Sequence, residues 1–156
     1  NGTDLTGNEL SGKPQLFAGA VANPGASDPD MEIDNLHRKI DAGAQFFQTQ
    51  AVYDVQAYAA FLDKARSPRP MLAGIIPIKS VKMATYMNER IPGVDIPDAL
   101  IQKIADAGDD KNQIARVSVE IAAKTIQELR SVSPGVHLMA IGWENYIPQI
   151  LTLSQP

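Results

Sequence analysis

Cysteine is absent from this chain of 156 residues, and histidine occurs only twice, at His37 and His137. The lack of thiols excludes disulfide bonds, a thiolate nucleophile and a cysteine-ligated metal. Two histidines are too few for a histidine-rich metal site, so we expect no bound metal. A chain without cysteine also fits a reducing compartment, and we expect a cytoplasmic protein.

Excess positive charge is missing as well. Lys and Arg number 14 against 18 Asp and Glu, which gives a net charge of -4. A general nucleic-acid surface needs a basic excess, so we expect no nucleic-acid partner. No apolar run approaches the roughly 20 residues of a membrane helix, and residues 1–4 do not resemble the start of a signal peptide. We therefore expect no association with a membrane.

The chain also lacks a proper match to the common nucleotide-binding motifs. The chain has no Gly-x-Gly-x-x-Gly fingerprint, which weakens a dinucleotide-binding interpretation. Residues 7–14 imitate a phosphate-binding loop, but Pro14 replaces the required hydroxyl. That segment also precedes an expected strand, whereas a phosphate-binding loop follows one and opens a helix. The motifs therefore identify no nucleotide site.

What the chain does have is a regular alternation of apolar and amphipathic segments after a lead-in loop at 1–14. The apolar segments predict strands at 15–22, 45–51, 71–78 and 136–141. The amphipathic segments predict helices at about 28–42, 54–65, 80–90, 97–106, 110–132 and 144–153. Strands separated by helices predict an α/β fold with a parallel sheet. Two architectures fit: a small open doubly wound sheet, and half of an eight-stranded (β/α) barrel.

The most informative stretch is residues 34–50, where a helix ends in a basic pair and a glycine turn leads into a polar strand. Gln48 and Gln50 lie two residues apart and so point to the same face of that strand. An unpaired buried amide costs on the order of 1–3 kcal/mol. The pattern therefore predicts that this strand ends at a binding site.

Several segments together resemble the methylenetetrahydrofolate reductase family over about residues 17–151. The segments that carry the resemblance are Gly19–Pro24, Asp34–Ala44, Gln48–Gln50 with Tyr53 and Asp54, Ala73–Ile78 and Pro134–His137. The resemblance implies a (β/α)8 TIM barrel that binds FAD at its carboxyl face. It also implies that hydride passes from NADH or NADPH through the flavin to methylene-tetrahydrofolate, in the one-carbon metabolism that supplies methionine. The four strands resemble the last four of that barrel, so the first half is expected to be missing from this chain.

The resemblance also assigns site residues. An acid, Asn, Arg and Lys at spacings of three, three and one match a flavin-contacting helix, and Asn23 matches a flavin-contacting strand end. The implied cofactor-binding residues are thus Asn23, Glu32, Asn35, Arg38 and Lys39. Gln50 matches a glutamine that contacts the folate substrate, and Trp143 lies where relatives can carry polar or cationic folate contacts. The family's proton-donating Glu and flavin-tuning Asp belong to strands outside this chain, so no catalytic residue is carried over.

Plainer interpretations of the same residues stay open. Arg38 and Lys39 suit a solvated helix face, Gln50 can satisfy loop backbone, and Trp143 can be a packing anchor. Two functions fit: part of a flavin-dependent reductase, or a non-catalytic accessory half-barrel that needs a partner chain or a second copy. We expect the isolated 156 residues to be inactive and to bind FAD weakly or not at all.

Overall fold

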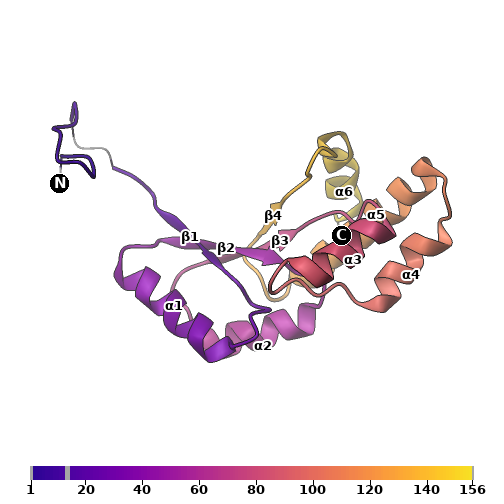
Figure 1. Cartoon of the computed structure of the whole chain (residues 1–156), viewed down its shortest axis with the longest axis horizontal. Coiled ribbons are helices and arrows are strands. Elements are labelled where there is room, and N and C mark those ends of the chain that lie inside the picture. The colour runs from indigo at the N-terminus through magenta and orange to yellow at the C-terminus, as the bar shows by residue number, and fades with distance from the viewer. Residues whose placement is uncertain (1, 13–14, 156) are drawn as a thin grey trace.

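The computed structural model describes residues 2–12 and 15–155 of the chain, which form one sheet with helices packed against it (Figure 1). The strands are β1 (Gly19–Ala22), β2 (Phe46–Ala51), β3 (Met71–Ile75) and β4 (Val136–Leu138). The helices are α1 (Pro29–Asp41), α2 (Val55–Ala65), α3 (Val81–Arg90), α4 (Asp98–Asp106), α5 (Lys111–Leu129), the 3-10 turn η1 (Glu144–Tyr146) and α6 (Ile147–Leu153). The alternation predicted from the sequence is confirmed.

The sheet has the strand order β1-β2-β3-β4, with every pair parallel. Connections between neighbouring parallel strands are right-handed, so a sheet wound in one direction carries its crossover helices on one face. In Figure 1, α1 and α2 both lie below the sheet. A doubly wound sheet reverses its strand order at a switch point, and this one does not. The doubly wound alternative is therefore wrong, and the four units are arranged as in part of a (β/α) barrel.

The helix-covered face of the sheet holds the main core. Leu36, Phe47, Tyr58 and Leu129 are almost completely buried there and come from α1, β2, α2 and α5. A second cluster lies between α3, α4 and α5, and Met87 belongs to it with Met83 packed at its margin. The two methionines are four residues apart and so lie on one face of α3, against this second cluster.

The opposite face of the sheet is not covered by helices of the described residues. Along β2, the buried side chains alternate with half-buried Phe46, Gln48 and Gln50. Val21 on β1 is 59% exposed, and the Phe46 ring lies across Gly19 and stacks on Phe17 at a centroid distance of 5.3 Å. This face is therefore apolar near the amino ends of the strands and carries the two amides near their carboxyl ends.

Three predicted strands are shorter than the sequence suggests. The ladder between β1 and β2 begins at the pair Gly19 and Phe46, so residues 15–18 lie outside it. Ala18 bonds to Gln45: its N–H donates to the Gln45 side chain, and its carbonyl accepts from the Gln45 N–H at 2.8 Å. The strand predicted at 71–78 ends at Ile75, and the one predicted at 136–141 ends at Leu138. Beyond β4, Ile141 and Gly142 have φ angles of 50° and 82°, which are incompatible with an extended strand.

Some helices end at other residues than the sequence predicts. The helix predicted at 144–153 is split into η1 and α6, since Pro148 has no N–H to donate to the carbonyl of Glu144. The helix predicted to reach 132 ends at Leu129. Residues 2–12 of the lead-in form a loop closed by a bridge between Thr3 and Glu9, and positions 13 and 14 lie outside the described residues. No helix in the described ranges is both long and apolar enough to cross a bilayer.

Candidate ligand-binding rim at the carboxyl ends of the strands

The outer edge of β1 ends in a small polar cluster. The N–H of Asn23 donates to Oε1 of Glu32 at 2.9 Å, and Nζ of Lys39 donates to the carbonyl of Val21 at 2.7 Å. The same Lys39 and Glu32 atoms lie 4.0 Å apart. A neighbouring parallel strand would pair with this same carbonyl and N–H. The two α1 side chains therefore occupy the pairing positions of the edge strand, which protects an edge that could otherwise pair with another chain.

The Asn23 side chain is directed at the loop between α3 and α4. Its Nδ2 donates to the carbonyl of Pro92 at 3.1 Å. Its Oδ1 is buried and has no hydrogen-bond partner among the described residues. Gly93 faces it with φ 81°, and a Cβ there would overlap the Asn23 amide. The base of this loop is held by Asn88, whose side-chain amide makes hydrogen bonds of 2.9 and 2.7 Å with the carbonyl and N–H of Ile96.

The rest of the predicted flavin helix lies on the exposed side of α1. The Arg38 guanidinium donates to Oδ1 of Asn35, and the Arg38 side chain is exposed. Of the five predicted cofactor-binding residues, Asn23, Glu32 and Lys39 thus form one cluster. Arg38 and Asn35 form an adjacent pair that remains accessible to solvent.

A β-bulge interrupts β2 next to Gln50. The register of β2 against β3 shifts between Gln48 and Ala51. The Thr49 hydroxyl fills the gap: its Oγ1 accepts from the N–H of Gly74 at 2.9 Å and donates to the carbonyl of Gln50 at 2.7 Å. A Cβ at Gly74 would collide with the carbonyls of Thr49 and Gln50. Bulges bend a strand and re-aim the side chains beside it, often near active sites.

Neither Gln48 nor Gln50 makes a side-chain hydrogen bond within residues 2–12 and 15–155. Both side chains are half-buried rather than enclosed, so water can reach their amides. The interpretation of Gln50 as a group that satisfies loop backbone finds no contact in the described chain. The amides remain able to donate to and accept from a ligand.

A cation and an aromatic ring meet at the carboxyl ends of β3 and β4. Nζ of Lys79 lies 5.7 Å from the ring centroid of Trp143, within the range of a cation–π interaction. Trp143 also packs against Tyr146, with ring centroids 4.9 Å apart. The N–H groups of Glu144 and Gly142, with Lys79 nearby, lower the pKa of the exposed Glu144 carboxyl. The packing interpretation of Trp143 is thus partly right, since the ring is half-buried.

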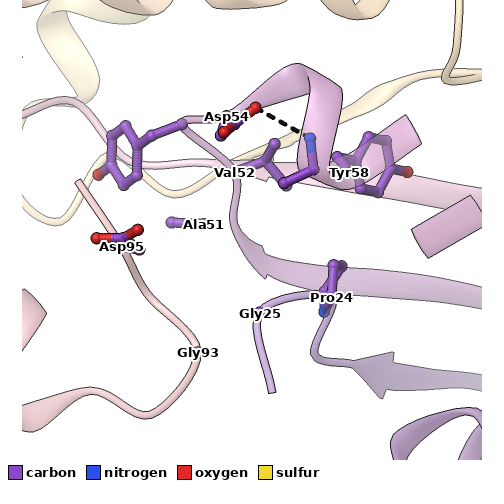
Figure 2. Close-up of a pocket in the computed structure, with 10 residues that line it drawn as sticks. Pro24, Gly25, Ala51, Val52, Asp54, Tyr58, Gly93 and Asp95 are labelled. Atoms are coloured by element: carbon purple, nitrogen blue, oxygen red, sulfur yellow. Dashed lines mark hydrogen bonds between the residues drawn. The ribbon is translucent and has the colours of Figure 1, made fainter. Parts of the chain in front are cut away.

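A cavity of about 200 Å³ lies between these regions, at the carboxyl ends of β1 and β2. Figure 2 shows Pro24 and Gly25 on one side of it and Val52 and Asp54 on another, with Gly93 and Asp95 contributed by the α3–α4 loop. Asp54 is committed to its own helix, because Oδ1 accepts from the N–H groups of Gln56 and Ala57 at 2.9 Å. This cap orients α2 at the rim of the cavity.

The predicted site residues therefore share one rim. Lys39 contacts β1 at Val21, which pairs with Gln48, and Gln50 follows on the same strand. Trp143 lies after β4, two strands along from β2. The sequence reasoning did not single out Lys79, Thr49 or Asn88. Only Lys79 left a local signal, as the first charged residue after the apolar run at 71–78.

A singly wound parallel sheet with crossover helices defines an α/β protein of the barrel type. Comparison with known proteins refines that class: the chain belongs to the methylenetetrahydrofolate reductase family, whose family model matches residues 9–155.

The relatives share modest sequence identity with this chain. Methylenetetrahydrofolate reductase 1 of Schizosaccharomyces pombe is 27% identical over 147 residues, which cover 88% of this chain and 24% of that protein. The 5,10-methylenetetrahydrofolate reductase of Escherichia coli is 27% identical over 141 residues, covering 76% of this chain and 47% of that enzyme. The chain thus spans about a quarter of the first relative and about half of the second.

A solved structure shares the fold. It is an uncharacterized protein from Clostridium thermocellum described as binding two copies of 5-methyl-5,6,7,8-tetrahydrofolic acid. The TM-score is 0.59 at 24% identity, and the match covers 90% of this chain and 53% of that one.

The donors on α1 suit a phosphate-bearing cofactor such as FAD in part. Arg38 is exposed, and the Lys39 ammonium retains donors beyond the one used on Val21. Glu32 and the N–H of Asn23, in contrast, satisfy one another. Arg38, Lys39 and Asn35 are thus the residues that would hold the group, and the bound flavin would supply hydride chemistry.

Proposed function

We propose that this chain supplies the folate-binding side of a flavin-dependent reductase that converts methylene-tetrahydrofolate to methyl-tetrahydrofolate. The observation that carries the proposal is Gln50, an amide with no partner in the described chain, placed beside a β-bulge at the carboxyl rim of a family member. A pterin presents adjacent donors and acceptors, and a primary amide can satisfy both kinds. The absence of cysteine supports a cytoplasmic location.

Within this proposal the α1 residues bind FAD, and a nicotinamide is the electron donor. The basic pair Arg38 and Lys39 supports the first part, since guanidinium and ammonium groups recognise phosphates well. Lys39 is already hydrogen-bonded to Val21 and Glu32 is hydrogen-bonded to Asn23. We therefore expect this chain alone to bind FAD weakly. A flavin-fluorescence titration that gave sub-micromolar affinity would contradict that expectation.

Binding of 5-methyltetrahydrofolate to the 156-residue chain, measured by calorimetry, tests the folate assignment. We expect Gln50→Met to weaken binding by about tenfold, because the loss of one or two hydrogen bonds in a partly enclosed site costs about 1.5 kcal/mol. Gln56→Met on the exposed side of α2 is the matched control and should bind as the unchanged chain does. Equal binding by the two variants would refute the role of Gln50.

A second function is favoured by the uncovered face of the sheet. Val21 and Phe17 are 59% and 68% exposed, and both are large and apolar. Such a surface suits an accessory half-barrel that is completed by a partner chain or by a second copy. Light scattering on the purified chain separates the two functions: a monomer that binds methyl-tetrahydrofolate supports the first, and an assembly that binds no folate supports the second.

A further inference from the structure

The bulge in β2 adds one residue to this strand on the side that faces β3. From Gln48 to Ala51 the chain advances three residues, while their partners on β3 advance two, from Leu72 to Gly74. The pairing of β2 with β1, on its other side, stays in register up to its last pair. The extra residue therefore displaces the backbone locally, next to Gln50, and not the strand as a whole.

The Thr49 hydroxyl replaces the ladder contact that the bulge removes. In a regular parallel pair the N–H of Gly74 would donate to a carbonyl of β2, but here it donates to Oγ1 of Thr49 at 2.9 Å. The same hydroxyl donates to the carbonyl of Gln50 at 2.7 Å. The ladder resumes where the N–H of Val52 donates to the carbonyl of Gly74 at 2.8 Å. Thr49 is 4% exposed, so water has little access to replace these bonds if the hydroxyl is lost.

Two further features keep this backbone in place. Gly74 leaves no room for a Cβ, which would collide with the carbonyl oxygens of Thr49 and Gln50. After the strand, the Tyr53 hydroxyl donates to the carbonyl of Ile76 at 2.9 Å and so ties the following segment to the end of β3. The backbone is thus anchored on both sides of Gln50, whose own amide makes no hydrogen bond in the described chain. The direction of that amide is therefore set by the bulge.

We propose that Thr49 is a positioning residue for Gln50: its hydroxyl holds the bulge in the shape that directs the Gln50 amide at a ligand on the carboxyl rim. The proposal rests on the proposed function, in which Gln50 binds the pterin of the folate. Thr49 does not contact that ligand, because its side chain is buried and alternates along β2 with the half-buried amides. Loss of the hydroxyl weakens ligand binding only through Gln50.

A double-mutant cycle measured by calorimetry with 5-methyltetrahydrofolate tests this dependence. We expect Thr49→Val to weaken binding about fivefold and Gln50→Met about tenfold. Because both changes remove the same interaction, the double variant should bind about as weakly as Gln50→Met alone. A loss of about fiftyfold, the product of independent effects, would overturn the proposal, as would unchanged affinity in Thr49→Val. Thr49→Ser keeps the hydroxyl and should bind within about twofold of the unchanged chain.

Val119→Ala on α5 is the control for lost stability. Val119 is 2% exposed in the main core, so the change destabilises the chain by removing buried volume. It should leave the affinity for 5-methyltetrahydrofolate unchanged. An equal loss of affinity in Val119→Ala and Thr49→Val would mean that lowered stability, and not the direction of Gln50, weakens binding, and the proposal would be wrong.

The side-chain NH2 resonances of Gln50 report its position without any ligand. Their disappearance from the NMR spectrum of Gln50→Met identifies them. We expect Thr49→Val to shift these resonances and to leave those of Gln127 in place, since Nε2 of Gln127 donates to the carbonyl of Leu153 at 2.8 Å. Unmoved Gln50 resonances would overturn the proposal even in a chain that binds folate. Shifted resonances in a chain that binds no folate would refute the proposed function alone and support the coupling of Thr49 to Gln50.

Discussion

The two ends of the carboxyl rim use similar side chains in opposite ways. At β1, the ammonium of Lys39 and the carboxylate of Glu32 are hydrogen-bonded to backbone groups of Val21 and Asn23. At β3 and β4, the ammonium of Lys79 lies 5.7 Å from the Trp143 ring centroid and makes no hydrogen bond or ion pair with the described residues. A cation at a strand end is thus not by itself a ligand contact. The two lysines differ in whether the ammonium group already donates a hydrogen bond to the chain's own backbone.

The largest predicted effect concerns the β-bulge where β2 pairs with β3. Gly74→Ala should lower the free energy of unfolding by about 3 kcal/mol, since its Cβ would meet two backbone carbonyls that cannot move aside. Urea denaturation followed by circular dichroism measures the effect. Gly135→Ala is the control, because a Cβ there would meet only the flexible end of Leu72. Equal costs for the two variants would show that the bulge is not rigid.

The next test removes a single hydroxyl from the same region. Thr49→Val should cost about 2 kcal/mol, because the buried N–H of Gly74 loses its acceptor while the side-chain volume is kept. Thr125→Val is the matched control. Thr125 is also buried, but its hydroxyl only adds a bond to the carbonyl of Ile121 within a helix. Thermal unfolding of both variants measures the difference, and a costlier Thr125→Val would contradict the structural role given to Thr49.

The fold could be predicted from the sequence much more fully than the rim. Asp54 and Asp110 are placed at helix starts by local pattern, and both are N-caps. Tyr58 and Phe61 share a stripe at helical spacing, and both are buried. These features depend on neighbours within a few residues, so a single sequence contains the information.

The rim depends on contacts between distant parts of the chain. The Thr49 hydroxyl meets an N–H 25 residues away, at Gly74. Lys79 meets Trp143 only because β3 and β4 are neighbours in the sheet. Periodicity cannot show that a strand has a bulge or that two strand ends face each other. The resemblance pointed to residues that the structure places along one rim, but it could not show which of their charged groups are already hydrogen-bonded to the backbone.

The third-largest predicted effect is the difference in stability between variants of the two lysines. Lys39→Met should lower stability by about 1 kcal/mol, because the carbonyl of Val21 loses a donor and Glu32 loses its cation. The effect is small because the Lys39 side chain is 39% exposed, so solvent screens its interaction with Glu32. Lys79→Met should change stability by less than about 0.5 kcal/mol, as is usual for a side chain without backbone bonds. Urea denaturation of the two variants measures both losses of stability. A larger loss in Lys79→Met than in Lys39→Met would show that the assignment of roles is wrong.

The smallest effect concerns the pH dependence of the β4 end. The N–H groups of Glu144 and Gly142, with Lys79 nearby, lower the pKa of Glu144 in the folded chain. A carboxyl with a lowered folded-state pKa favours folding when it is ionised, above its ordinary pKa, and this contribution is lost as the pH falls through the folded value. Glu144→Gln should therefore lower the melting temperature slightly at pH 7 and by less at pH 3. Glu89→Gln on the exposed surface of α3 serves as the control. If Glu144→Gln lowered the melting temperature as much at pH 3 as at pH 7, the charge of the carboxylate would not be what stabilises this turn. The β4 end of the rim would then not differ from the β1 end in the way that its charges are used.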